Sequence, residues 1–153
     1  MSNFKDKIER QLEELRRKNL SKEERAVMTV LWQKWKAGSE KVTQVDIARH
    51  EVWMGCHEKY EAGRVARPDE TTLRKVRQII RDLRVNHFAP ILSSRDGYWI
   101  PKTETEVKQY LERLEAEAKA QIQSWLETHK SMEVTFGMSC EYLQAQQKLW
   151  PQG

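Results

Sequence analysis

Basic side chains are concentrated in one short segment of this sequence. Residues 64–84 contain seven Lys and Arg residues against three Asp and Glu residues, a surplus of four that equals the formal net charge of +4 of the whole chain. A Lys or Arg side chain that is placed on a phosphate group releases condensed counterions, which is the electrostatic basis of binding to a nucleic-acid backbone. The uneven charge therefore predicts that this segment contacts phosphates.

Most of these bases belong to a predicted helix that begins after Asp69. Apolar residues recur at positions 73, 76, 80 and 83, a helical spacing that defines a buried side, and Asp69 can cap the helix. A charged face opposite an apolar stripe is by itself typical of any solvated helix. After Glu70, however, five bases stand against one acid. This imbalance favours a binding role.

A short β-hairpin is predicted directly after the basic helix. Two β-prone runs in residues 89–101 flank the dipeptide Asp96-Gly97, which is a strong turn signal. Gly97 permits the positive φ that a tight turn requires, and Pro101 is tolerated where the strand leaves its ladder. This hairpin is the only β element that we expect.

Apolar spacing predicts the other elements, which must position the basic helix. The first is an N-terminal helical arm in residues 1–20, with the stripe Phe4, Ile8, Leu12 and Leu15. A core in residues 21–102 follows, with a helix that starts at the Ser21 to Glu24 capping box, a short helix over Thr43 to Trp53 and a loop at residues 54–68. The chain then continues as a long helix over residues 103–130, with an apolar stripe from Val107 to Trp125, and as a tail at residues 131–153. We expect Trp32, Trp35, Trp53 and Trp125 to pack in a core.

The order helix, helix, loop, basic helix, hairpin is that of a winged helix-turn-helix domain. Residues 71–101 resemble the winged module at the N-terminus of biotin repressors and the related bacterial helix-turn-helix family. The residues that carry the resemblance are Leu83-Arg84, Ile91, Ser93-Ser94, Gly97-Tyr98, Ile100 and Pro101. The family joins its supporting and recognition helices by a few residues, whereas the loop at residues 54–68 intervenes here. The resemblance implies a mainly α fold with a hairpin wing, flanked by the N-terminal and long C-terminal helices.

The function that we expect is sequence-specific binding of double-stranded DNA, as in a bacterial or phage transcription regulator. The alternative is a winged-helix adaptor that binds another protein in a phage or plasmid replication or packaging complex. For DNA, the start of the basic helix would meet base edges and the other bases would meet phosphates. The expected base contacts are Thr71, Thr72, Arg74, Lys75 and Gln78, and the expected phosphate contacts are Arg64, Arg67, Arg77, Arg81, Arg84 and Arg95.

Motifs of catalysis and metal binding are not found in the sequence. Cys56-His57, His50 and His87 lack zinc-site spacing, and nothing places a base beside Cys56 or Cys140. There is no phosphate-binding glycine loop, nucleophile elbow or His-Glu-x-x-His motif. We therefore expect a protein that is not an enzyme and that uses no metal and no cofactor.

The remaining expectations concern location and assembly. Two distant cysteines do not build a disulfide framework, the N-terminal segment is charged, and no apolar run approaches the roughly 20 residues of a membrane span. These features predict a cytoplasmic protein that does not enter a membrane. The narrow stripes of Phe4 to Leu15 and of Val107 to Trp125 each require a partner, and the two helices could pair antiparallel within one chain or cross between two chains. Of these alternatives we expect a homodimer that forms through the two helices.

Overall fold

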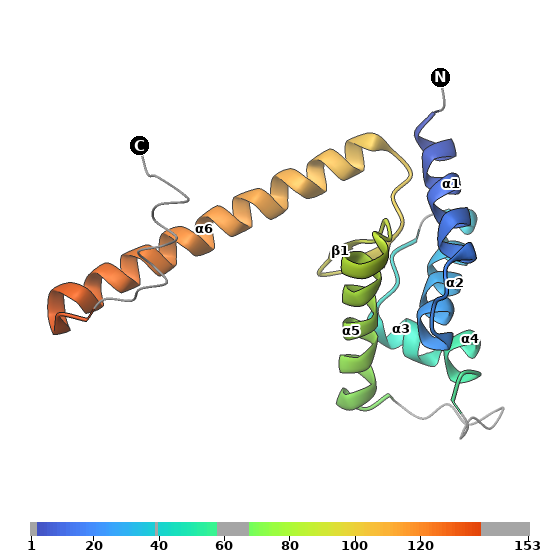
Figure 1. Ribbon diagram of the computed structural model, residues 1–153, viewed down its shortest axis with the longest axis horizontal. Helices are drawn as coiled ribbons and strands as arrows, with labels where there is room; N and C mark the ends of the chain where they lie inside the picture. The colour runs from blue at the N-terminus through green and yellow to red at the C-terminus, as the bar shows by residue number, and fades with distance from the viewer. Residues whose placement is uncertain (1–2, 39, 58–67, 139–153) are drawn as a thin grey trace. The chain divides into compact units, whose positions relative to one another are not determined.

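The computed structural model describes residues 3–38, 40–57 and 68–138, which form a mainly helical structure with one small antiparallel sheet. The elements in chain order are α1 (Phe4–Arg17), α2 (Lys22–Ala37), α3 (Gln44–Arg49), α4 (Glu51–Met54), α5 (Glu70–His87), β1 (Leu92–Ser94), β2 (Gly97–Trp99) and α6 (Glu104–Phe136) (Figure 1). The chain divides into two compact units, one up to Lys108 and one from Gln109 onward. The predicted mainly α class with a single hairpin is confirmed.

Polar caps determine where the helices begin. The Ser21 hydroxyl accepts the Glu24 amide at 3.1 Å while the Glu24 carboxylate accepts the Ser21 amide at 2.9 Å, which completes the predicted capping box. Asp69 accepts the amide of Thr72 at 2.8 Å and so caps α5 as predicted. These bonds satisfy amides that have no partner within their own helices.

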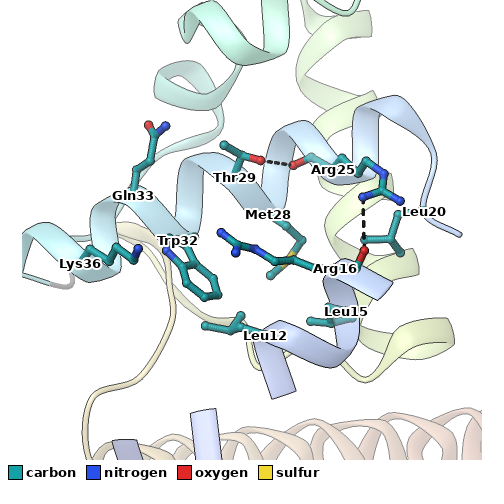
Figure 2. A pocket seen from close by; sticks show the side chains of 10 residues that line it. All are labelled: Leu12, Leu15, Arg16, Leu20, Arg25, Met28, Thr29, Trp32, Gln33 and Lys36. Carbon is teal, nitrogen blue, oxygen red and sulfur yellow. Dashed lines mark hydrogen bonds between the residues drawn. The ribbon is translucent and has the colours of Figure 1, made fainter. Parts of the chain in front are cut away.

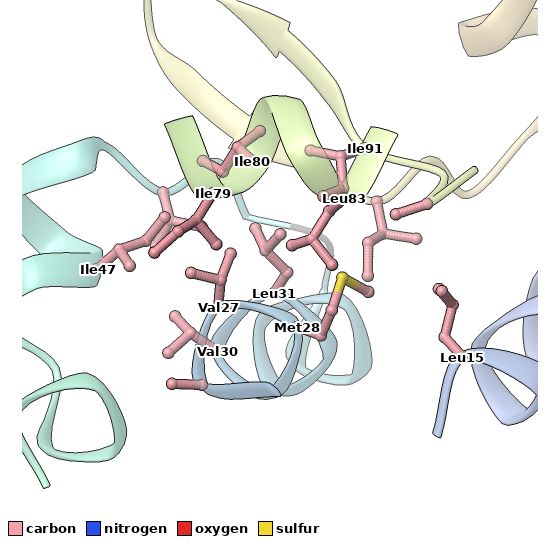
Figure 3. Close-up of a cluster of buried hydrophobic side chains, with 14 of the residues drawn as sticks. Leu15, Val27, Met28, Val30, Leu31, Ile47, Ile79, Ile80, Leu83 and Ile91 are labelled. Atoms are coloured by element: carbon pink, nitrogen blue, oxygen red, sulfur yellow. The ribbon is translucent and has the colours of Figure 1, made fainter. Parts of the chain in front are cut away.

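The hydrophobic core forms where α5 packs against both α2 and α3 (Figure 3). Val27, Val30 and Leu31 of α2 are almost fully buried. Ile47 of α3 and Ile80 of α5 are equally buried against them. Because these side chains come from three elements, burial of their apolar surface fixes the position of α5 relative to its supporting helices.

The strands β1 and β2 pair antiparallel, with Leu92 opposite Trp99 and Ser94 opposite Gly97. A third segment joins them, because the amide of Val42 donates to the Tyr98 carbonyl at 2.9 Å and the amide of Tyr98 donates to the Val42 carbonyl at 2.8 Å. The approach is so close that a Cβ at Gly97 would lie 2.4 Å from the Val42 oxygen. The hairpin is thus attached to the segment that precedes α3.

Two predicted elements differ from the observed ones. The helix expected over Thr43 to Trp53 is two helices, because His50 adopts an extended backbone with a ψ of 139° and caps α4 through its Nδ1 atom. The C-terminal helix does not end near residue 130 but continues to Phe136. Its first residue, Glu104, agrees with the predicted start within one residue.

The N-terminal arm is part of the core. Ile8, Leu12 and Leu15 are at most 5% exposed and belong to the same buried cluster as the residues of α2. The Arg25 guanidinium of α2 donates to the carbonyl of Lys18 at 3.0 Å, just after α1 ends. The predicted use of the Phe4 to Leu15 stripe for dimerisation is therefore wrong, because its own chain already covers these side chains.

Helix α6 contrasts with α1, since none of its residues from Glu104 to Phe136 is buried. Leu111 is 56% exposed and Phe136 is 66% exposed. The expected core packing of Trp125 is also not observed, because this side chain is 37% exposed. Among the described residues, no helix combines the length and apolar character that a membrane crossing needs.

Candidate nucleic-acid interface

Helix α5 has one buried face and one exposed polar face. Val76, Ile79, Ile80 and Leu83 are buried, whereas Thr71, Arg74, Gln78 and Arg81 are exposed on the opposite side. The exposed residues are three or four positions apart, which places them in one line along the helix. Four of the residues that the sequence predicted as contacts therefore share one accessible face.

Arg74 and Arg81 make no hydrogen bond or ion pair with the part of the chain that the structure describes. Gln78, which lies between them, donates to the Asp82 carboxylate at 2.9 Å. Because an exposed guanidinium carries five N–H donors, the two arginines can each bind a base edge or a phosphate without breaking an internal contact.

Two predicted base contacts lie off this line. Lys75 forms a 2.7 Å ion pair with Glu23 of α2, and Thr72 is half-buried next to the cap formed by Asp69. Thr72 therefore lies toward the protein, and Lys75, although exposed, is held by Glu23. The structure thus groups Thr71, Arg74 and Gln78 but does not bring Thr72 and Lys75 together with them.

Arg77 belongs to a polar chain that links three elements. Its guanidinium donates to the Glu70 carboxylate at 2.7 Å and to Oε1 of Gln44 at 2.9 Å. Gln44, at the start of α3, in turn donates through Nε2 to the hydroxyl of Tyr98 at 3.2 Å. These bonds connect α5 to α3 and to β2. Sequence reasoning missed Gln44, whose only signal is its position directly after the Thr43 cap.

Arg84 is half-buried between α5 and the hairpin. Its Nε atom donates to the Ile91 carbonyl at 2.9 Å, and its guanidinium carbon lies 6.0 Å from the centre of the Tyr98 ring. Nη2 is buried without a hydrogen-bond partner among the described atoms. The geometry therefore assigns Arg84 a positioning role at the base of the hairpin, whereas the sequence predicted a phosphate contact.

Two basic side chains lie at the hairpin, one at its tip and one beside its second strand. Arg95, at the tip, is exposed, and Lys41 lies 4.6 Å from the Trp99 ring centre and 3.8 Å from the Asp96 carboxylate. Trp99 Nε1 donates to Glu106 at 3.2 Å, which holds its indole in place. Lys41 was not predicted, because its relation to the hairpin depends on the pairing of Val42 with Tyr98.

The electrostatics at the start of α5 follow from its cap. The backbone amide and the side chain of Thr72 donate to the Asp69 carboxylate and lower the pKa of Asp69 below its usual value.

The predicted phosphate contacts Arg64 and Arg67 lie outside the described residues.

A separate pocket of about 500 Å³ lies between α1 and α2 (Figure 2). Leu12, Leu15 and Met28 form part of its lining. The Arg16 guanidinium carbon lies 4.1 Å and the Lys36 ammonium 4.9 Å from the Trp32 ring centre, distances at which cations are attracted to an indole.

The described residues contain no cluster of three His, Cys, Asp or Glu side chains that could hold a metal ion. The comparisons with known proteins add no relative to this geometry: no family model, no curated protein and no solved structure matches the chain.

Proposed function

We propose that this chain is a winged helix-turn-helix protein that binds double-stranded DNA, with α5 as its recognition helix and the β1–β2 hairpin as its wing. The observation that carries the proposal is the division of α5 into two faces. The buried face joins the core, and the opposite face presents Arg74, Gln78 and Arg81 to solvent. A helix that enters a major groove requires one such supported face and one such polar face.

The order of the elements supports the same proposal. Helices α2 and α3 both pack on α5, and the hairpin follows α5 directly. Val42 adds a third segment to the hairpin between α2 and α3. Two supporting helices, a recognition helix and a hairpin beside it are the parts that a winged domain brings to a duplex.

The charge distribution also supports binding to a polyanion. Residues 1–103 contain 22 Lys and Arg residues and 15 Asp and Glu residues, whereas residues 104–153 contain 5 and 8. The positive charge therefore belongs to the part of the chain that carries α5 and the hairpin. In this proposal Arg74 and Gln78 read bases, because Arg pairs with guanine and Gln with adenine, while Arg81 and Arg95 contact phosphates.

Transcription regulation is the role that we propose for such binding.

A second candidate, a winged adaptor that binds a protein, is favoured by one observation at the far end of α5. Val85 is 63% exposed, and Phe88 is 72% exposed with a φ of 55°. The left-handed conformation ends α5 at its C-cap, and exposed aromatic side chains are enriched at contact surfaces.

The experiment that tests DNA binding is a titration of random-sequence duplex at several salt concentrations. The logarithm of the binding constant should fall with the logarithm of the salt concentration, by about 0.9 per phosphate contact. Arg81→Ala should reduce this slope by about one, and Arg17→Ala, an exposed arginine of α1, should leave it unchanged. Absence of duplex binding would refute the proposal, and the protein-binding adaptor would then be the remaining candidate function.

Sequence specificity requires its own measurement. Bound sites selected from random DNA should converge on a motif, and Arg74→Ala should weaken binding to the selected site by about 1–3 kcal/mol. The same substitution should change the affinity for random duplex much less. Equal losses on both duplexes would show that Arg74 contacts the backbone and does not read a base.

A further inference from the structure

One apolar stripe runs along the whole of α6. Successive residues of an α-helix turn by about 100°, so side chains three or four positions apart share a face. By this spacing the stripe extends beyond Trp125, and the residues that form it are Val107, Leu111, Leu114, Ala118, Ile122, Trp125, His129, Met132 and Phe136. Leu111, Leu114, Met132 and Phe136 are between 39% and 66% exposed. This stripe has the length of a two-helix interface.

The stripe is self-complementary when a second copy runs antiparallel. With the crossing point between residues 121 and 122, Val107 faces Phe136 and Leu111 faces Met132 of the other copy. In the same register the small Ala118 faces the large Trp125. In a parallel pair Trp125 would face its own copy and Ala118 would face Ala118, which crowds one layer and leaves a gap in the other.

The charges beside the stripe fit the antiparallel register as well. In an antiparallel pair each flank of one helix lies against the same flank of the other, and Lys108, Glu112, Lys130 and Glu133 share one flank. The register places Lys108 beside Glu133 and Glu112 beside Lys130 of the second copy. Among the described residues of one chain, Lys108 pairs with the exposed Glu104 and Glu133 with the largely buried His129, each four positions away and at 3.9 Å. Such pairs are weak and readily shared.

We propose that two copies of this chain associate through antiparallel α6 helices, centred between Gln121 and Ile122. The inference does not rest on DNA binding, because α6 contains none of the residues proposed to contact DNA. It replaces the two-helix dimer expected from the sequence, since the α1 stripe is buried in its own chain.

Sedimentation equilibrium of the full chain at micromolar concentration tests the association. We expect a dimer that Leu111→Lys dissociates and that Val134→Lys, a matched change on the opposite face of α6, leaves intact. Lys108→Glu should weaken the dimer by about tenfold, because both copies lose an ion pair, and adding Glu133→Lys should restore it. A monomeric full chain would overturn the proposal and leave this chain's own residues 139–153 or another protein to cover the stripe.

Disulfide trapping tests the orientation. Cys56 and Cys140 are first replaced by Ser, so that only introduced thiols react. A mixture of Leu111→Cys and Met132→Cys chains should form mixed disulfide dimers, whereas Leu114→Cys chains alone should not link to each other. Linkage of Leu114→Cys with itself, without mixed linkage of the other pair, would overturn the antiparallel arrangement.

Discussion

Replacement of Gly97 by Ala should detach the hairpin from the segment before α3. The added Cβ would lie 2.4 Å from the oxygen and 2.7 Å from the carbonyl carbon of Val42. These neighbours are backbone atoms, which cannot rotate away as a side chain can. The segment at Val42 and the hairpin must therefore move apart, and the two hydrogen bonds between Val42 and Tyr98 are lost or lengthened.

The magnitude follows from two contributions. Gly97 has a φ of 131°, and a side chain held in such a conformation costs about 1–3 kcal/mol. Loss of two backbone hydrogen bonds adds about 1–3 kcal/mol. Gly38 is the matched control, because its φ of 140° imposes a similar strain while nothing lies within 4 Å of its added Cβ. Gly38→Ala should therefore show the first contribution without the second.

The assay is thermal and urea denaturation of both variants beside the parent chain. Gly97→Ala should be less stable than Gly38→Ala by about 1–3 kcal/mol, and each kcal/mol should lower the Tm by about 4–8 °C in a domain of this size. If the two variants lose the same stability within about 0.5 kcal/mol, the approach of Val42 does not restrain the hairpin. The reasoning would then be refuted.

Two further predictions concern the frame of the domain. The lowered pKa of Asp69 means that its contribution to stability is complete above the usual pKa and is lost as the pH falls through the lowered value. Asp69→Ala should therefore lower the Tm at neutral pH, with a difference from the parent that narrows in acid; a difference independent of pH would contradict this. Trp35→Phe should cost about 1–3 kcal/mol in urea denaturation, because it leaves the buried Pro101 carbonyl without its 3.1 Å donor. Trp32→Phe is the control, since the buried Trp32 N–H has no described partner, and an equal loss would contradict the assignment.

Local signals in the sequence were sufficient for most of the secondary structure. The capping box at Ser21, the cap at Asp69 and the turn at Asp96-Gly97 depend on residues within four positions of each other, and all three are present. The break at His50 was missed because the apolar positions on either side of it continue the same helical spacing. The pairing of Val42 with Tyr98 was missed because it joins segments more than fifty positions apart.

Prediction of the candidate site was limited for the same reason. The sequence predicted five base contacts from their position at the start of the helix, and three of them, Thr71, Arg74 and Gln78, share one exposed face. It could not reveal that Lys75 is paired with Glu23 or that Arg84 turns toward Ile91, because those contacts depend on how α5 packs on other elements. Spacing also could not distinguish the apolar stripe of α1, which is buried, from that of α6, in which no residue is buried.

The bonds that link Arg77, Gln44 and Tyr98 have a thermodynamic consequence. Together with the Arg84 contact to Ile91, they hold the hairpin and α5 in a fixed relation before any ligand arrives. A preorganised surface loses little conformational entropy on association. Calorimetry on a duplex should accordingly give a heat-capacity change that matches the apolar surface buried at the contact, without the additional negative change of a hairpin that folds on binding.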